Sequence, residues 1–168
     1  MQRAPLHGYF ESRERLAEFL GARGPGRRSG PVVLANGCFD LLHVGHLRYL
    51  AEAKSLGKTL VVALNSDASV RANKGAGRPW TPFLERVEVL CALEVVDFVL
   101  PFDEVTLEET LRALLPDVHA KGTDYTPETL PERHVDRELG IRIAICGDPK
   151  ERSSSELIEA LQAHPQQG

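Results

Sequence analysis

Asn36-Gly-Cys-Phe-Asp-Leu-Leu-His-Val-Gly-His46 stands between a short apolar run and a segment with helical periodicity. The run Pro31–Ala35 predicts a buried strand, and after Gly45 the residues Leu47 and Leu50 share one helical face. This stretch therefore forms a junction from a strand to a helix. The first N–H groups of a helix lack partners within it and carry a partial positive charge, so the junction favours a phosphate group as ligand.

On either side of this junction, short apolar runs alternate with helical patterns, which predicts an α/β fold with a parallel sheet and helices on both faces. Residues 65–82 are polar and rich in Gly and Pro, and they predict a loop. Ligands of such sheets bind beyond the carboxyl ends of the strands. Helices are expected near residues 45–56, 84–93, 107–115, 135–139 and 153–161, and strands at Pro31–Ala35, Thr59–Leu64, Val95–Leu100, Asp117–Lys121 and Ile141–Cys146.

The N-terminal part of the chain reads as an extension before the sheet. Residues 11–20 place Leu16, Phe19 and Leu20 on one helical face, which predicts a short helix. The next residues, 21–30, are a linker rich in Gly and Arg. We therefore predict an N-terminal helical extension with its linker over residues 1–30 and a domain over residues 31–168.

Composition limits the classes of function. The 168 residues carry a formal net charge of −4, from 20 basic and 24 acidic residues without a long run of either sign. Nucleic-acid binding is not expected because it needs a clustered basic face. A signal peptide and a run of 18 apolar residues are both missing from the sequence, so we expect a cytoplasmic protein without a membrane span. The 3 cysteines have no CxxC spacing, which argues against a zinc site and a disulfide framework.

His43 and His46 are the first candidate site residues. Side chains three apart on an opening helical turn can face the same way, and Gly45 and Gly37 allow backbone and ligand to approach closely. Imidazole N–H groups and helix-end amides can neutralise charge on a phosphorus under nucleophilic attack. On their own, the two histidines could equally form a metal pair or lie at the surface.

The whole string resembles the (T/N)GxFDxxHxGH motif of the cytidylyltransferase-like nucleotidyltransferases, a Rossmann-like superfamily. Within it, the chain is similar to the D-glycero-β-D-manno-heptose 1-phosphate adenylyltransferases, from about Val32 to Leu161, including VVALNSDASVRANKG, ALEVVDFV and KGTDY. The resemblance implies a five-stranded Rossmann-like sheet and transfer of AMP from ATP to a heptose 1-phosphate. The ADP-heptose formed would serve lipopolysaccharide core synthesis. A kinase segment is not recognisable, so a stand-alone enzyme is expected.

The resemblance also implies roles for residues near the motif. His43, His46 and Lys74, the last in the loop after the second strand, would contact the triphosphate and stabilise the transition state. Asp40 would hold the loop on the substrate side. Arg86 would lie near the phosphates, or alternatively form a structural ion pair with an acidic neighbour. The nucleotide cleft would be lined by Asn36, Gly37, Cys38 and Phe39.

Two later segments complete the implied site. In KGTDY, Lys121, Gly122 and Asp124 would border the nucleotide, and Lys121 with Tyr125 the sugar phosphate; Thr123 departs from the glycine common at its position. At the start of the last helix, Ser153, Ser154 and Ser155 would bind phosphates. Arg152 stands where relatives often have an apolar or small residue, and the same role for it is our own inference and not part of the resemblance. The alternative there is a helix cap, because Ser153 and Glu156 have capping-box spacing.

The expected partners are ATP and a sugar 1-phosphate, and family members commonly form homo-oligomers. Mg²⁺ is expected as cofactor, bound mainly through the nucleotide, since a set of metal-ligating side chains is not evident. One alternative is a cytidylyltransferase acting on glycerol 3-phosphate or a related phospho-alcohol. Another class is a nucleotide-binding sensor without activity, although His43, His46 and Lys74 are all present. Cys38 has no adjacent base in the sequence, so a thiol nucleophile is not expected.

Overall fold

The computed structural model describes residues 7–21 and 30–148 of the chain. Within them, five strands form one sheet in the order β3-β2-β1-β4-β5, and all neighbouring pairs are parallel. The predicted five-stranded Rossmann-like sheet is confirmed. The strands are β1 (Val32–Gly37), β2 (Thr59–Asn65), β3 (Phe98–Phe102), β4 (Val118–Gly122) and β5 (Arg142–Cys146).

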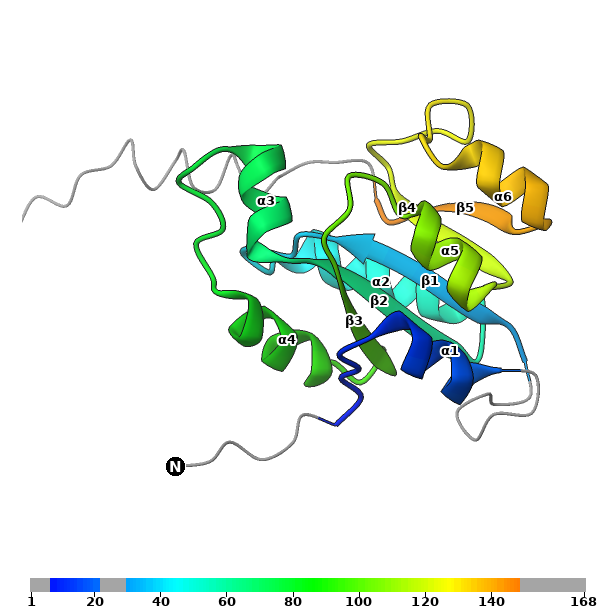
Figure 1. Cartoon of the computed structure of the whole chain (residues 1–168), viewed down its shortest axis with the longest axis horizontal. Helices are drawn as coiled ribbons and strands as arrows, with labels where there is room; N and C mark the ends of the chain where they lie inside the picture. The colour runs from blue at the N-terminus through cyan, green and yellow to red at the C-terminus, as the bar shows by residue number, and fades with distance from the viewer. Residues whose placement is uncertain (1–6, 22–29, 149–168) are drawn as a thin grey trace, which may run out of the picture.

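Helices cover both faces of the sheet (Figure 1). Successive side chains of a strand point to opposite faces, so β2 sends Leu60 and Val62 to one apolar cluster and Val61 and Ala63 to the other. All four side chains are fully buried. The first cluster packs under α2 (Val44–Ser55) and α4 (Phe83–Cys91), and the second under α1 (Arg13–Leu20), α5 (Glu108–Leu114) and α6 (Arg133–Leu139).

The predicted N-terminal helix is present as α1, and it contributes to the main core. Ser12 caps its N-terminus by accepting a hydrogen bond from the Arg15 N–H. Leu16 and Leu20 are buried in the second apolar cluster. The preceding segment continues the contact, because the Phe10 N–H donates to the Val99 carbonyl of β3. Residues 13–20 are therefore held against the sheet by apolar packing.

Two predicted boundaries are wrong. Residues 65–82 are not all loop, since they contain the helix α3 (Asp67–Lys74). Its N-terminus is capped by the Ser66 hydroxyl, but Val70 is its one buried apolar residue, so the apolar periodicity that signals a helix is absent. The third strand begins at Phe98 instead of Val95 because residues 92–95 form turns after α4. The helix predicted at 153–161 lies outside the described residues.

The order of the strands reverses between β1 and β4. From β1 the chain moves outward to β2 and β3, and then crosses back to β4 and β5. The pairing of β1 with β4 ends at Ala35 and Ala120. Asn36 and Lys121 therefore lie just past the last paired residues, at the carboxyl ends of both strands. Such a switch point is where open α/β sheets bind their ligands.

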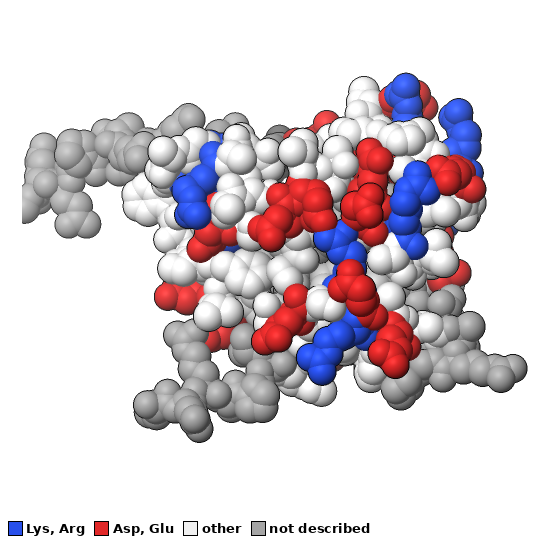
Figure 2. Space-filling model, viewed as in Figure 1, with Lys and Arg blue, Asp and Glu red and all other residues white. Residues whose placement is uncertain are grey.

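Surface charge on the face formed by α1, α5 and α6 is mixed. Figure 2 shows acidic and basic side chains interspersed over this face, with acidic ones in its centre. Among its ion pairs, Arg112 and Glu138 join α5 to α6. The described side chains of this face therefore do not form a continuous basic surface. Of the helices in residues 7–21 and 30–148, none has the length and apolar character needed to cross a bilayer.

Candidate active site

The turn after β1 is fixed by aromatic packing. Phe39 adopts a left-handed backbone conformation with φ of 45°, which is unfavourable for a bulky side chain. Its buried ring stacks on Tyr49 of α2 and lies 5.2 Å from the His46 ring, measured between centroids. Gly37 allows this arrangement, because a Cβ there would lie 2.9 Å from the Phe39 ring. Phe39 therefore shapes the turn from inside with its ring, and the predicted contact of its backbone with nucleotide stays a prediction.

His43 and His46 cap the start of α2 and lie together, with ring centroids 4.0 Å apart. The Nδ1 atom of His43 accepts a hydrogen bond from the Gly45 N–H (3.1 Å), and Nδ1 of His46 accepts one from the His43 N–H (3.3 Å). A ring nitrogen that accepts carries no hydrogen, so the proton of each neutral ring is on Nε2. The capping box thus makes both Nε2–H groups donors at a helix N-terminus.

Gly45 is required by the same geometry. A Cβ at this position would lie 2.9 Å from Cε1 of the His43 ring. A side chain there would therefore displace the ring from its capping position. Gly45 therefore allows the His43 ring to stay in its capping position at the start of α2.

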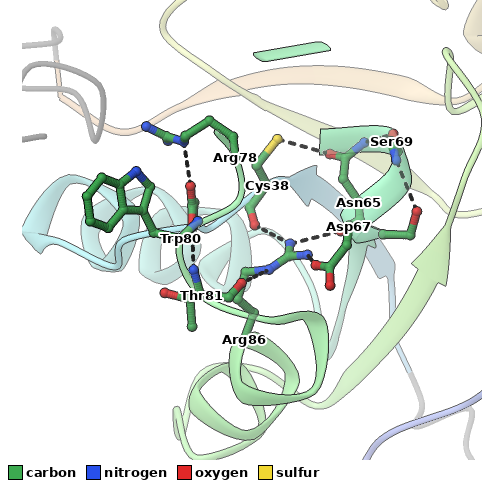
Figure 3. A network of polar contacts seen from close by, with 10 residues as sticks. Cys38, Asn65, Asp67, Ser69, Arg78, Trp80, Thr81 and Arg86 are labelled. Carbon is green, nitrogen blue, oxygen red and sulfur yellow. Dashed lines mark hydrogen bonds and ion pairs between the residues drawn. The ribbon is translucent and has the colours of Figure 1, made fainter. Parts of the chain in front are cut away.

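Asp40 ties the turn after β1 to the loop before α4. Its Oδ1 accepts hydrogen bonds from the Trp80 N–H (2.7 Å) and the Thr81 N–H (2.9 Å), while Oδ2 lies 2.7 Å from Nε of Arg78. Figure 3 labels the three partners of Asp40, namely Arg78, Trp80 and Thr81. The predicted loop-holding role of Asp40 agrees with these contacts. Its assignment to substrate binding does not, because the side chain is fully buried among protein groups.

Arg86 is the centre of a second network, drawn in Figure 3. Its guanidinium donates to the carbonyl oxygens of Thr81 (3.0 Å), Cys38 (2.7 Å) and Asn65 (2.8 Å), and to Oδ1 of Asp67 (2.7 Å). The side chain is fully buried. These contacts include the structural ion pair that the sequence analysis gave as the alternative for Arg86. The predicted contact of Arg86 with phosphate is corrected, because four hydrogen bonds hold the guanidinium inside the protein.

Cationic side chains surround Cys38 beside these networks. Burial raises the pKa of the Cys38 thiol, and the charges of Lys74, Arg86 and Arg78 oppose this only in part. The thiol is therefore protonated near neutral pH and is a poor nucleophile. Lys74 is the exposed last residue of α3, and not a loop residue as predicted. Arg78, which pairs with Asp40 and precedes Pro79, was not among the predicted site residues.

The other side of the switch point is built around Lys121. Its Nζ donates to Oδ1 of Asn36 (3.0 Å), lies 3.7 Å from Oε2 of Glu132 and stands 4.8 Å above the centroid of the Tyr125 ring. Burial lowers the pKa of Lys121, and the charge of Glu132 opposes the shift. Asn36 of β1 and Lys121 of β4 thus meet, as the sequence predicted. Glu132 was not predicted, because it belongs to no motif and only the fold places it near Lys121.

The remaining predicted residues lie at the edge of this group or outside the description. Gly122 ends β4, and Asp124 follows it on the surface. The nearby Thr123 hydroxyl donates to the Asp148 carbonyl (2.9 Å). Residues 152–155, predicted to bind phosphates, lie outside the described residues. The described part thus holds two imidazole Nε2–H donors at a helix N-terminus after β1 and a buried ammonium at the end of the neighbouring β4. Both kinds of donor suit a phosphorylated ligand.

Comparison with known proteins agrees with this chemistry. The family model described as cytidylyltransferase-like matches residues 34–160. The chain is 45% identical over 142 residues to the bifunctional protein HldE of Syntrophotalea carbinolica, covering 84% of this chain and 29% of that protein. It is 50% identical over 129 residues to HldE of Streptomyces coelicolor, covering 77% and 28%. The chain thus spans less than a third of the length of these relatives.

Solved structures show the same likeness. A lipopolysaccharide core biosynthesis protein from Thermoplasma volcanium superposes with a TM-score of 0.62 at 28% identity, covering 73% of this chain and 100% of that one. A pantothenate synthetase from Thermus thermophilus gives a TM-score of 0.60 at 16% identity, covering 86% and 62%. The second comparison shows likeness of fold alone.

Arg86→Ala should destabilise the protein, because it leaves Asp67 and buried carbonyl oxygens without their donor. We expect the free energy of unfolding to fall by about 3 kcal/mol or more in urea denaturation. Arg48→Ala is the control, since its ion pair with Asp148 is exposed and should contribute less than about 1 kcal/mol. A fully stable Arg86→Ala protein with a raised KM for ATP would show instead that Arg86 is a phosphate ligand.

Proposed function

Because the chain belongs to the cytidylyltransferase-like family and is a nucleotidyltransferase, we propose that it transfers AMP from ATP to D-glycero-β-D-manno-heptose 1-phosphate. The reaction releases pyrophosphate and forms ADP-heptose, the activated sugar of the lipopolysaccharide core. Two observations support this choice of substrates. First, the NGCFDLLHVGH and KGTDY segments resemble those of the heptose enzymes. Second, the relative from Syntrophotalea carbinolica carries the name HldE, and the solved structure with 28% identity is named a lipopolysaccharide core biosynthesis protein.

The observation that carries the proposal is the pair of Nε2–H donors at the start of α2. An oxygen of the sugar phosphate attacks the α-phosphorus of ATP, and the bond from that phosphorus to the pyrophosphate oxygen breaks. Negative charge grows on the oxygens around the phosphorus during this step. His43 and His46 donate hydrogen bonds to these oxygens, and because the capping bonds already hold both rings, no reorganisation is needed.

The other residues bind and orient the reactants. Lys121, held between Asn36 and Tyr125, supplies a positive charge for the acceptor phosphate. Lys74, at the exposed end of α3, reaches the triphosphate. The protonated Cys38 thiol suits direct transfer between the two phosphates, without a covalent enzyme intermediate.

Mg²⁺ fits this site as a companion of the nucleotide. In the described part of the chain, His, Cys, Asp and Glu side chains do not form a group of three that could hold a metal ion. The carboxylate within the motif, Asp40, is occupied by Trp80, Thr81 and Arg78. The phosphates of ATP would therefore be the main ligands of Mg²⁺, which would neutralise charge on the leaving pyrophosphate.

The two histidines act on phosphates alone, so they do not distinguish one base from another. A cytidylyltransferase acting on glycerol 3-phosphate uses the same attack at an α-phosphorus, and the family description itself refers to cytidylyl transfer. A sensor that binds nucleotide without turnover would retain the cleft but lack pyrophosphate release. Both alternatives are separated from the proposal by a single assay.

The assay is a pyrophosphate-release panel that crosses ATP, CTP, GTP and UTP with heptose 1-phosphate and glycerol 3-phosphate. We expect ATP with D-glycero-β-D-manno-heptose 1-phosphate to give the highest kcat/KM, because the resemblance is strongest to enzymes using this pair. A tenfold or greater preference for CTP with glycerol 3-phosphate, about 1.4 kcal/mol in transition-state binding, would overturn the heptose assignment. Nucleotide binding without pyrophosphate release from any pair would favour the sensor.

His46→Ala should reduce turnover far more than it weakens ATP binding. Loss of one preorganised donor to developing charge costs about 10²–10³-fold in kcat, whereas calorimetry should find the Kd for ATP within about tenfold of wild type. His134→Ala removes an exposed imidazole on α6 and should leave kcat unchanged. A folded His46→Ala protein that retains about a third of wild-type turnover would rule out this role for the imidazole.

A further inference from the structure

Four ionisable side chains are buried between β4 and α6, which lie next to each other in the fold (Figure 1). His119 and Lys121 are two apart on β4 and point to the same face of the sheet. Glu132 immediately precedes α6, and Asp136 is in its first turn. All four are at most 5% exposed. The residues implied by the family motifs include only Lys121, so the other three have no assigned role.

The two oxygens of Glu132 have different tasks. Oε1 accepts a hydrogen bond from the Leu107 N–H (3.0 Å), just before α5. Oε2 lies 3.7 Å from Nζ of Lys121, and it is a buried atom without a hydrogen bond to the described residues. The first oxygen anchors a helix start. The second directs negative charge at the ammonium that donates to Asn36 at the switch point.

We propose that Glu132 is a positioning residue for nucleotidyl transfer: its carboxylate keeps Lys121 charged and holds the ammonium beside Asn36, where it meets the phosphate of the acceptor. This inference rests on the proposed function for the acceptor, but the charge coupling between the two residues stands independently of it. Lys121 touches substrate in this scheme, and Glu132 acts through Lys121.

The electrostatics of the buried residues support this role. Burial lowers the pKa of Lys121, while Glu132 and, more weakly, Asp136 raise it. Burial also disfavours the ionised form of Glu132, but Lys121, the Leu107 N–H and His119 together lower its pKa below the ordinary value. Behind them, Nδ1 of His119 lies 3.0 and 3.1 Å from the two oxygens of Asp136. The charges of Lys121 and Glu132 therefore depend on each other.

Stability alone gives little reason for this arrangement. A buried ion pair often contributes no more to stability than apolar side chains of similar size, because both charges lose their hydration. In the pair here, Oε2 of Glu132 has no hydrogen bond to the described residues and lies 3.7 Å from an ammonium that donates to Asn36. The geometry is better suited to presenting a cation at the end of β4 than to closing a salt bridge.

Glu132→Gln tests the proposal with little change of shape. The amide oxygen of the glutamine can still accept from the Leu107 N–H, so the start of α5 is retained, whereas the negative charge is lost. Glu138→Gln is the matched control, because it removes an exposed carboxylate in α6 that pairs with Arg112. Lysine side chains labelled with ¹³C allow the pKa of Lys121 to be measured by NMR titration in the protein without substrate.

We expect the pKa of Lys121 to fall by about one pH unit or more in Glu132→Gln, because an opposite charge at this distance favours the ammonium, and to stay unchanged in Glu138→Gln. In the pyrophosphate-release assay, the alkaline limb of kcat/KM should move to lower pH by a similar amount, since the active, protonated lysine is lost earlier as pH rises. A pKa of Lys121 equal to that of wild type would overturn the proposal.

The reciprocal variant gives a second test should Glu132→Gln fail to fold. In Lys121→Met, the pKa of the Glu132 carboxyl, followed by its ¹³C resonance, should rise because burial is no longer opposed by the ammonium. An unchanged Glu132 pKa would contradict the coupling. If both pKa shifts occur but wild-type protein releases pyrophosphate from none of the substrate pairs, the charge coupling is supported and the proposed function is overturned.

Discussion

Two hydrogen bonds from backbone N–H groups to imidazole Nδ1 atoms determine what the start of α2 can do. They satisfy donors that every helix N-terminus leaves open, and they also select the Nε2–H tautomer of His43 and His46. A structural need of the helix and a chemical need of the reaction are thus met by the same contacts. Gly45 makes room for the first ring, and Phe39 packs against the second.

The surrounding polar network keeps this helix start in place relative to the sheet. Asp40 holds the loop before α4, and Arg86 joins the turn after β1 to the end of β2 and the start of α3. Neither group needs to touch substrate to matter for activity. On the other side of the switch point, Lys121 faces the same edge from β4. A reaction that moves charge between two phosphates gains from such fixed donors, because positioning and charge stabilisation are most of its catalysis.

Periodicity in the sequence predicted much of the fold, since the core strands are continuous apolar runs and α2, α4 and α5 have clear apolar faces. It could not predict α3, because Val70 is the one buried apolar residue of that helix and the Ser66 hydroxyl caps its start. The motif predicted that His43, His46, Asn36 and Lys121 would meet at one edge.

The sequence could not assign the buried polar residues. Whether Arg86 binds phosphate or protein depends on Asp67, 19 residues away, and on carbonyl oxygens whose positions the fold alone determines. Glu132 carries no motif, and its significance comes from lying 3.7 Å from Lys121. The predicted phosphate role of residues 152–155 stays a prediction, because they lie outside the described residues.

The most direct test of the account is the tautomeric state of the two imidazoles. Long-range ¹H–¹⁵N NMR of ¹⁵N-histidine protein at a pH of about 8, above the ordinary pKa of an imidazole, distinguishes a protonated from an unprotonated ring nitrogen. We expect Nε2–H and an unprotonated Nδ1 in both His43 and His46, and a change of both Nε2 resonances when a non-hydrolysable ATP analogue binds. An Nδ1–H tautomer in either ring, or Nε2 resonances that ignore the bound nucleotide, would contradict the claim that the helix cap prepares these histidines as phosphate donors.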